Sequence, residues 1–159
     1  MAYCVDPSPA VGEHNEVHTT QKNPLLAERL FSNGHTYIYL KGVASTIAGS
    51  WVAYDEAGVT TGLDSDVTAS INSPVAIATA AVDATTKFGW YGVQGSFPAG
   101  AGTVADNGKV YATATVFICD DAAVTGNQVH GAQWRSTDSA GLATAQIDHP
   151  FIGVTDAII

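Results

Sequence analysis

The clearest pattern of apolar and polar positions lies in residues 72–95, NSPVAIATAAVDATTKFGWYGVQG. An apolar run, PVAIATAAV, is followed by a polar break, DATTK, and by a second apolar run, FGWYGV. Two such runs separated by a short break predict an antiparallel pair of buried strands. The alanines of the first run would leave room for the rings of Phe88 and Trp90 on the second. We expect the rest of the chain to be organised around this pair.

Further strands are predicted where short runs of aromatic and β-branched residues lie between turn residues. They cover residues 37–40, 51–54, 59–63, 128–134 and 143–147. Strict alternation over residues 109–118 predicts a longer strand with one apolar face and one mixed face. The strongest turn signal is Asp106-Asn107-Gly108, and residues 55–58 form a second turn candidate.

One short helix is predicted over residues 23–34, NPLLAERLFSNG. Asn23 suits the N-cap and Pro24 the first helical position, and either Asn33 or Gly34 can end the helix. Leucines spaced along this segment would form its apolar stripe. A helix of this length is not stable alone, so it must dock on the domain.

Residues 1–22 are polar, contain Pro7, Pro9 and Gly12, and show no periodicity. This composition predicts an extended N-terminal arm that is disordered when free and becomes an interaction arm when docked on a neighbour. We therefore expect its deletion to leave the thermal melt of the domain nearly unchanged.

These elements predict a mainly β protein, a single-domain β-barrel or β-sandwich with one short N-terminal helix and an extended N-terminal arm. The arm covers residues 1–22 and the single β domain covers residues 23–159. A chain of 159 residues is of the right length for one domain with a sizeable core.

The composition and net charge of the chain restrict the classes of partner that it can bind. Charged residues make up 13% of the chain, about half the usual share, and the net charge is −9. The six cations are scattered, so a nucleic-acid partner is not expected, and an acidic domain is drawn instead to a basic protein surface. No signal peptide and no membrane span are expected from the sequence. Cys4 and Cys119 are too few for a disulfide framework, and we expect both to stay reduced in the cytoplasm where the protein is made.

Candidate metal ligands have a simpler interpretation. Glu13, His14, Glu16 and His18 lie in the predicted arm, without the fixed geometry that a metal site needs. Asp64-Ser65-Asp66 begins like a calcium loop, but the required Gly and Glu further along are absent. We expect no metal and no cofactor.

Catalytic candidates are equally weak. Asp120 and Asp121 are adjacent, so on an extended chain they would point to opposite faces and could not act on one substrate. His130 and His149 lack a nucleophile elbow or a cysteine signature to act with. We expect no catalytic residues and no enzyme activity.

Aromatic side chains offer one binding alternative. Trp90, within the FGWYG run, is expected in the core. Trp134 lies between Gln133 and Arg135 in a polar neighbourhood and is the tryptophan expected at the surface, where it would stack on a sugar ring or a protein partner.

The runs HTYIYLKGVASTIAGSWVAYDEAGVTTGL, SPVAIATAAVDATTKFGWYGVQG and KVYATATVFICDDAAVTGNQVHGAQWRSTDSAGLATAQIDHPFI together resemble the capsid decoration, or cement, proteins of tailed phages, especially short-tailed, podovirus-like ones. The shared pattern is a PVAIA-type strand, an aromatic GWY strand, then GKVY and a Gly- and Ala-rich hairpin. The resemblance covers roughly residues 37–151. It implies a β-barrel-like module without catalytic residues that binds the outside of an assembled shell in many copies.

The implied function is that of a viral structural protein that binds the outer capsid surface of the virion and bridges major capsid protein subunits. A homo-oligomer is expected, a trimer by analogy with local threefold axes, with a dimer as the alternative. The competing hypothesis is a tail-associated or host-recognition module that binds surface glycan through Trp134. Residues expected to contact the partner were chosen for apolarity and exposure: Tyr3, Val5, Val11, Val17, Leu25, Leu26, Trp134, Phe151, Ile158 and Ile159.

Overall fold

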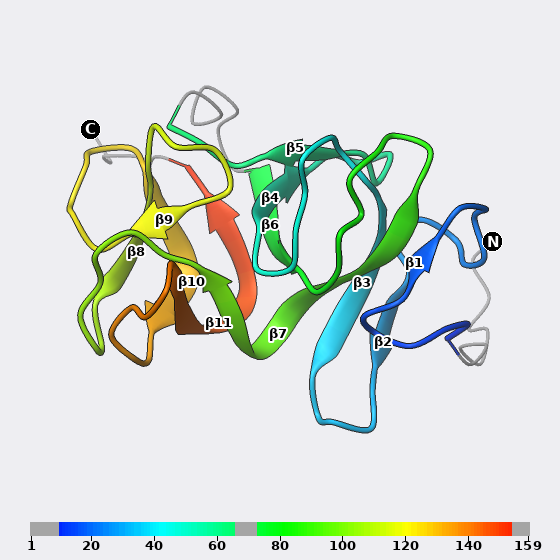
Figure 1. The fold of residues 1–159 in the computed structure, drawn as a ribbon, viewed down its shortest axis with the longest axis horizontal. Coiled ribbons are helices and arrows are strands. Elements are labelled where there is room, and N and C mark those ends of the chain that lie inside the picture. Colours follow the sequence, from blue (N-terminus) through cyan, green and yellow to red (C-terminus); the bar gives the residue numbers. More distant parts are fainter. Residues whose placement is uncertain (1–9, 66–72, 154–159) are drawn as a thin grey trace, which may run out of the picture.

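A computed structural model describes residues 10–65 and 73–153, which form β-strands joined by turns and loops (Figure 1). The strands are β1 (Val17–His18), β2 (Glu28–Leu30), β3 (Thr36–Lys41), β4 (Trp51–Tyr54), β5 (Thr60–Gly62), β6 (Ser73–Ala78), β7 (Phe88–Gly100), β8 (Lys109–Ala112), β9 (Cys119–Asp120), β10 (Gln128–Trp134) and β11 (Leu142–Ile152). All strand pairs are antiparallel and belong to one sheet. The protein is therefore mainly β, as the sequence predicts.

Strand β7 joins the two halves of the molecule (Figure 1). Its first half pairs with β3 and its second half with β11, so one continuous strand belongs to both halves. The pairing changes at Gly95, whose φ of 130° is accessible to glycine but rarely to other residues. Gly92 lies opposite Ile77 of β6, which confirms the predicted antiparallel pair. The main path of the sheet runs β2-β3-β7-β6-β11-β10-β8-β9 and does not close into a barrel.

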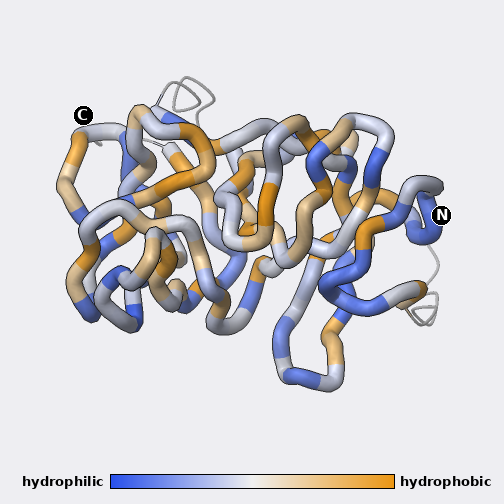
Figure 2. The backbone as a smooth tube through the Cα atoms, viewed as in Figure 1, coloured by the Kyte–Doolittle hydropathy of each residue, from blue (hydrophilic) through white to orange (hydrophobic). Residues whose placement is uncertain are grey.

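Both faces of the central strands are buried. On one face the larger core contains the rings of Tyr37, Tyr39 and Trp90 together with much of the second half of the molecule. On the other face a smaller core gathers around Tyr91. Figure 2 shows hydrophobic stretches along the central strands and a hydrophilic tip on the hairpin between β2 and β3. Strands buried on both sides explain why the charged fraction of this chain is so low.

The alanines of β6 pack in the core that contains Tyr91, and not against Phe88 and Trp90 as expected. Ala76 and Ala78 share the smaller core with Tyr91, whereas Trp90 lies in the larger core on the opposite face. Consecutive residues of a strand point to opposite faces, so the small side chains can face Tyr91 or Trp90 but not both. The pairing was predicted correctly and the partner ring was not.

The predicted helix over residues 23–34 is wrong. This segment forms a turn followed by β2, and Leu26 has a φ of 66°, outside the helical region. The backbone pairs with β3 instead: Leu26 N–H donates to Tyr39 O, and Tyr39 N–H donates to the Ala27 carbonyl. Leu25 packs on the larger core and Leu26 on the smaller one. A short segment has little helical stability of its own, so the edge of β3 determines its conformation.

The long strand expected over residues 109–118 is also wrong beyond residue 112. β8 ends at Ala112, and the following residues form a loop in which the Thr113 hydroxyl lies within hydrogen-bond distance of the Thr115 and Ile118 carbonyl oxygens. Phe117 has a φ of 70°, so the alternating pattern does not continue as strand. A side-chain hydroxyl that bonds nearby backbone groups competes with strand pairing, and here it ends the strand.

Several local predictions are confirmed. β4 and β10 cover the predicted residues, and β3 extends its prediction by one residue at each end. The Gly58 N–H donates to the Asp55 carbonyl in the turn predicted over residues 55–58, and the Gly108 N–H donates to the Ala105 carbonyl in the turn predicted at residues 106–108. These elements depend on local backbone chemistry, so the sequence alone was enough to find them.

Gly92 provides a test of the packing on β7. A Cβ at this position would lie 2.5 Å from ring atoms of the buried Phe97. We expect Gly92→Ala to lower the free energy of unfolding by about 1–3 kcal/mol through overpacking. Gly102→Ala is the control, because its nearest neighbour, Asp120 Cβ, would lie 3.3 Å away. Chemical denaturation of both variants measures the effect, and equal stability of the two would show that β7 is not tightly packed.

Candidate interaction site

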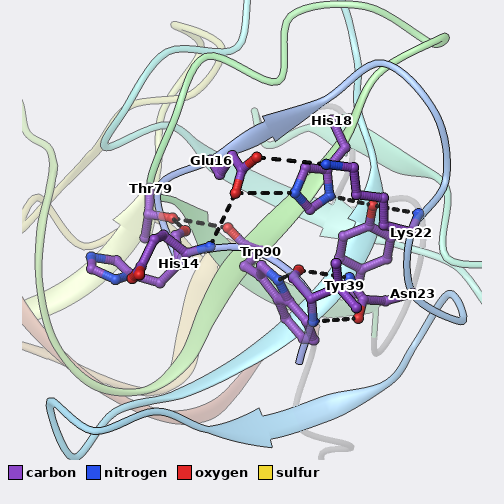
Figure 3. Close-up of polar contacts among 10 residues, drawn as sticks. His14, Glu16, His18, Lys22, Asn23, Tyr39, Thr79 and Trp90 are labelled. Carbon is purple, nitrogen blue, oxygen red and sulfur yellow. Dashed lines mark hydrogen bonds and ion pairs between the residues drawn. The ribbon is translucent and has the colours of Figure 1, made fainter. Parts of the chain in front are cut away.

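The predicted arm is described from residue 10 onward, and there it is docked on its own domain (Figure 3). Asn23 ties it down reciprocally: its side-chain oxygen accepts from Val11 N–H at 2.9 Å and its amide donates to the Val11 carbonyl at 3.0 Å. The Trp90 indole donates to the same carbonyl at 3.3 Å. The Thr79 hydroxyl lies between the carbonyl oxygens of His14 and Trp90. The segment over residues 10–23 thus covers the larger core beside β3 and β7 and does not stand apart as an arm.

A buried polar cluster fixes the middle of this segment (Figure 3). The Tyr39 hydroxyl accepts from Lys22 N–H at 3.2 Å and lies 2.7 Å from His18 Nδ1. Nε2 of the buried His18 lies 3.6 Å from a Glu16 carboxylate oxygen. Hydrogen bonding from Glu13 N–H, together with the nearby charge of Lys22, lowers the pKa of Glu16. The cluster therefore holds a carboxylate at the surface, directly beside the buried imidazole.

Three loops present an apolar surface elsewhere on the molecule. Ile47, Val116 and Leu142 are 64%, 42% and 41% exposed, and they surround a shallow hollow that Phe117 also lines. No lining residue of this three-loop patch carries an ionisable group. In a protein with a net charge of −9, such a surface is a distinct neutral area. Exposed apolar groups gathered in one place are typical of a protein contact surface.

Two loops of the three-loop patch contain unusual backbone conformations that surrounding contacts impose. Ser45 and Phe117 have φ values of 69° and 70°, which cost free energy in residues other than glycine. Backbone hydrogen bonds anchor the same loops: Gly49 N–H donates to the Ala78 carbonyl, and Trp51 N–H donates to the Phe117 carbonyl. These hydrogen bonds anchor the loops to neighbouring strands, which favours a contact surface that is formed before a partner binds.

A second hollow adjoins the patch and shares Ala48, Gly49 and Leu142 with it. Its other wall comes from His14, and it extends to His35 on the β2–β3 hairpin. We name it the aromatic hollow because His14, His35, Tyr37 and Phe97 line it, and these rings contact one another.

Most predicted contact residues do not come together. Val11 and Phe151 are exposed, whereas Val17, Leu25 and Leu26 pack partly against the cores. Phe151 stacks on His130 with ring centroids 5.0 Å apart. Tyr3, Val5, Ile158 and Ile159 lie outside the described residues.

The expectation of an exposed Trp134 is wrong. Its side chain is fully buried and meets Trp51 edge to face, with ring centroids 5.9 Å apart. The Trp134 indole donates to the Asp120 carbonyl at 3.2 Å. The polar neighbours Gln133 and Arg135 do not indicate the exposure of Trp134, because alternate residues along a strand point to opposite faces. Trp90, by contrast, is buried as predicted.

The two adjacent carboxylates, Asp120 and Asp121, bind different parts of the backbone. The Asp120 carboxylate accepts from Ala122 N–H, and the Asp121 carboxylate accepts from Ala105 N–H in another loop. In residues 10–65 and 73–153 no three His, Cys, Asp or Glu side chains are grouped as metal ligands. The same residues contain no helix that could cross a membrane.

Comparison of the chain with protein-family models, with curated proteins and with solved structures found no match.

Sequence reasoning missed the three-loop patch entirely. Ile47 lies in a Gly- and Ser-containing loop, Val116 belongs to the apolar face of the strand expected over residues 109–118, and Leu142 begins β11. Ile47 and Val116 are 69 positions apart in the sequence, so no local pattern joins them. The only available signal was an isolated branched apolar residue between small loop residues.

Docking of residues 10–23 is testable through Asn23. We expect Asn23→Ala to lower the free energy of unfolding by about 1–2 kcal/mol, because backbone groups of Val11 lose their partner. Asn15→Ala is the matched control, since Asn15 is exposed and its side chain makes no hydrogen bond within the described chain. Thermal and denaturant melts of both variants decide the matter. We also expect deletion of residues 1–22 to lower the melting temperature, contrary to the behaviour of a free arm.

A pH-dependent contact joins β2 to β11. His149, with a φ of 43°, lies 3.0 Å from Asp148 and 3.3 Å from Glu28. The hydrogen bond to Asp148 raises the pKa of His149 above 6.5, burial opposes this, and the charge of Glu28 adds to it. A pKa raised by folding stabilises the protein fully below the unfolded pKa and loses that effect as pH rises through the folded pKa.

We therefore expect the melting temperature of the wild type to exceed that of His149→Asn most at pH values below about 6.5, with the difference shrinking toward alkaline pH. Asn is chosen because it tolerates a positive φ. The contribution should stay at about 1 kcal/mol or less, since the pair is exposed. A difference between the two proteins that does not change with pH would contradict the ion pair.

Proposed function

We propose that this protein is a structural component of a tailed-phage virion that binds the outer surface of the assembled capsid and stabilises it by bridging major capsid protein subunits. Two observations support this. The strand motifs resemble those of capsid decoration proteins, and the β-sandwich-like scaffold presents the three-loop patch. The observation that carries the proposal is the patch itself, with Ile47 64% exposed among uncharged neighbours.

The mechanism is linkage between binding and assembly. A protein that binds the expanded shell but not free subunits stabilises the shell by its binding free energy, about 2.7 kcal/mol per site at a hundredfold excess over Kd. Contact with two neighbouring subunits adds effective concentration, because the second contact forms within one complex. The net charge of −9 directs the protein toward basic surfaces, and the uncharged patch makes the close contact.

The proposed partners follow from this mechanism. They are the major capsid protein and further copies of this chain, as a trimer or alternatively a dimer, with no nucleic acid and no membrane. The protein would be made in the host cytoplasm and would function on the outer capsid surface. Val11 and Phe151 remain candidates for secondary contacts because they are 46% and 40% exposed. The alternative, a glycan-binding tail module, loses the side chain on which it rested, because Trp134 is buried.

The test compares binding of the purified protein to expanded empty shells, procapsids and free capsid protein by co-sedimentation. We expect binding to expanded shells only, and we expect the double variant Ile47→Asp/Leu142→Asp to weaken it at least tenfold, or about 1.4 kcal/mol. The charged groups would have to be desolvated in the contact. Leu30→Asp is the matched control, because Leu30 is 73% exposed but outside the patch.

Melting curves must show that the double variant folds as the wild type does. Light scattering of the protein alone gives the oligomeric mass and decides between monomer, dimer and trimer. Equal binding to all three capsid forms would contradict the proposal, and adsorption to host cells without shell binding would favour the glycan-binding alternative.

A further inference from the structure

The edge of β7 that faces away from β11 is open over a short stretch. In an antiparallel pair, alternate residues direct their N–H and C=O groups toward the partner strand. Ala101 N–H donates to the Gly141 carbonyl, so Ala101 faces the β11 side, and Phe97 and Ala99 share its orientation. Ser96, Pro98 and Gly100 therefore direct their backbone groups to the opposite side.

Both ends of this opposite edge are paired. At one end Gly100 N–H donates to the Gly49 carbonyl, and the Gly100 carbonyl accepts from the Trp51 indole at 3.1 Å. At the other end Gln94 pairs with Thr36 of β3. Between them, within the part of the chain that the structure describes, no hydrogen bond involves the backbone of Ser96 or Pro98 on that side. The gap therefore offers one donor, Ser96 N–H, and two acceptors, the Ser96 and Pro98 carbonyl oxygens.

This gap opens into the aromatic hollow. Ser96, Phe97 and Pro98 line it along β7, with His35 at one end and Ala48 and Gly49 at the other. Ser96 and Pro98 are exposed, so an added segment can reach the edge, while Phe97 is buried beneath it. The hollow has a volume of about 330 Å³, within the range of natural ligand sites. Three consecutive residues of β7 line it, a stretch that suits a short extended segment rather than a folded element.

The charges around the hollow restrict what can occupy it. No carboxylate, ammonium or guanidinium group lines it, and it continues into the uncharged three-loop patch through Leu142. An acidic segment would be repelled by the net charge of −9, and a basic side chain would find no carboxylate among the lining residues to replace its water. The matching occupant is an uncharged extended segment whose alternate side chains are apolar.

We infer that the open edge of β7 at Ser96 and Pro98 binds an extended, uncharged segment of a partner protein by β-strand addition. Backbone hydrogen bonds to the Ser96 and Pro98 groups hold the segment, and its alternate side chains enter the aromatic hollow. An added strand would satisfy both parts of this site. Its backbone would pair with the open edge, and its side chains would cover the apolar walls. The inference goes beyond the proposed function, because it holds for any partner that supplies such a segment.

The experiment uses the whole protein and a capped heptapeptide of alternating Thr and Val. Nuclear magnetic resonance follows the amide of Ser96 as the peptide is added. We expect hydrogen exchange at this amide to slow at least tenfold at saturation, because Ser96 N–H gains an acceptor. We also prepare two N-methylated forms of the peptide, one methylated on each alternate set of amides. An added strand turns only one set toward β7, so one form should lose binding and the other should keep it.

Ala48→Glu tests the wall of the hollow. Ala48 is exposed, so the variant should fold normally, and a carboxylate there should weaken peptide binding at least tenfold. Ala57→Glu places the same charge on an exposed turn away from the hollow and should leave binding unchanged. Unchanged exchange at Ser96, or equal binding of both methylated peptides, would overturn the inference. Neither result depends on capsid shells, so this inference and the proposed function can fail separately.

Discussion

The continuous pairing of β7 is the constraint on which the rest of this structure depends. Its first half pairs with β3 and its second half with β11, and Gly95 allows the strand to turn between them. β7 also carries side chains of both cores, Trp90 and Phe97 in the larger one and Tyr91 and Val93 in the smaller one. Charged side chains near such a strand would be costly in free energy, since both of its faces are removed from water.

Burial on both faces also explains the fate of the N-terminal residues. The rings of Tyr39 and Trp90 lie on a face that needs a cover, and residues 10–23 provide it through the Asn23 and Tyr39 hydrogen bonds. A polar segment is suited to this position because its backbone carbonyls satisfy the indole and hydroxyl groups at the edge of the core. What looks like an interaction arm in the sequence is a structural part of the domain from residue 10 onward.

Two neighbouring surfaces carry the functional proposals made for this protein. The three-loop patch combines exposed Ile47, Val116 and Leu142 with fixed loops and no charge, and the aromatic hollow beside it ends on an open strand edge. The two are continuous at Ala48, Gly49 and Leu142, so a partner that covers the patch also reaches the edge of β7. Two of the six non-glycine residues with a positive φ, Ser45 and Phe117, line the patch.

The sequence by itself determined the β class, the paired strands β6 and β7, the short strands β4 and β10, and the turns at Gly58 and Gly108. Each depends on periodicity or turn chemistry within a few residues. Tertiary structure decided that residues 23–34 pair with β3 instead of forming a helix, that Trp134 is buried against Trp51, and that Tyr91 faces the β6 alanines. It also assembled the three-loop patch from residues far apart in the chain. The physical reason is that helix or strand, and buried or exposed, are settled by which sheet edge or core face is free to accept a segment, and that is fixed only when distant strands meet.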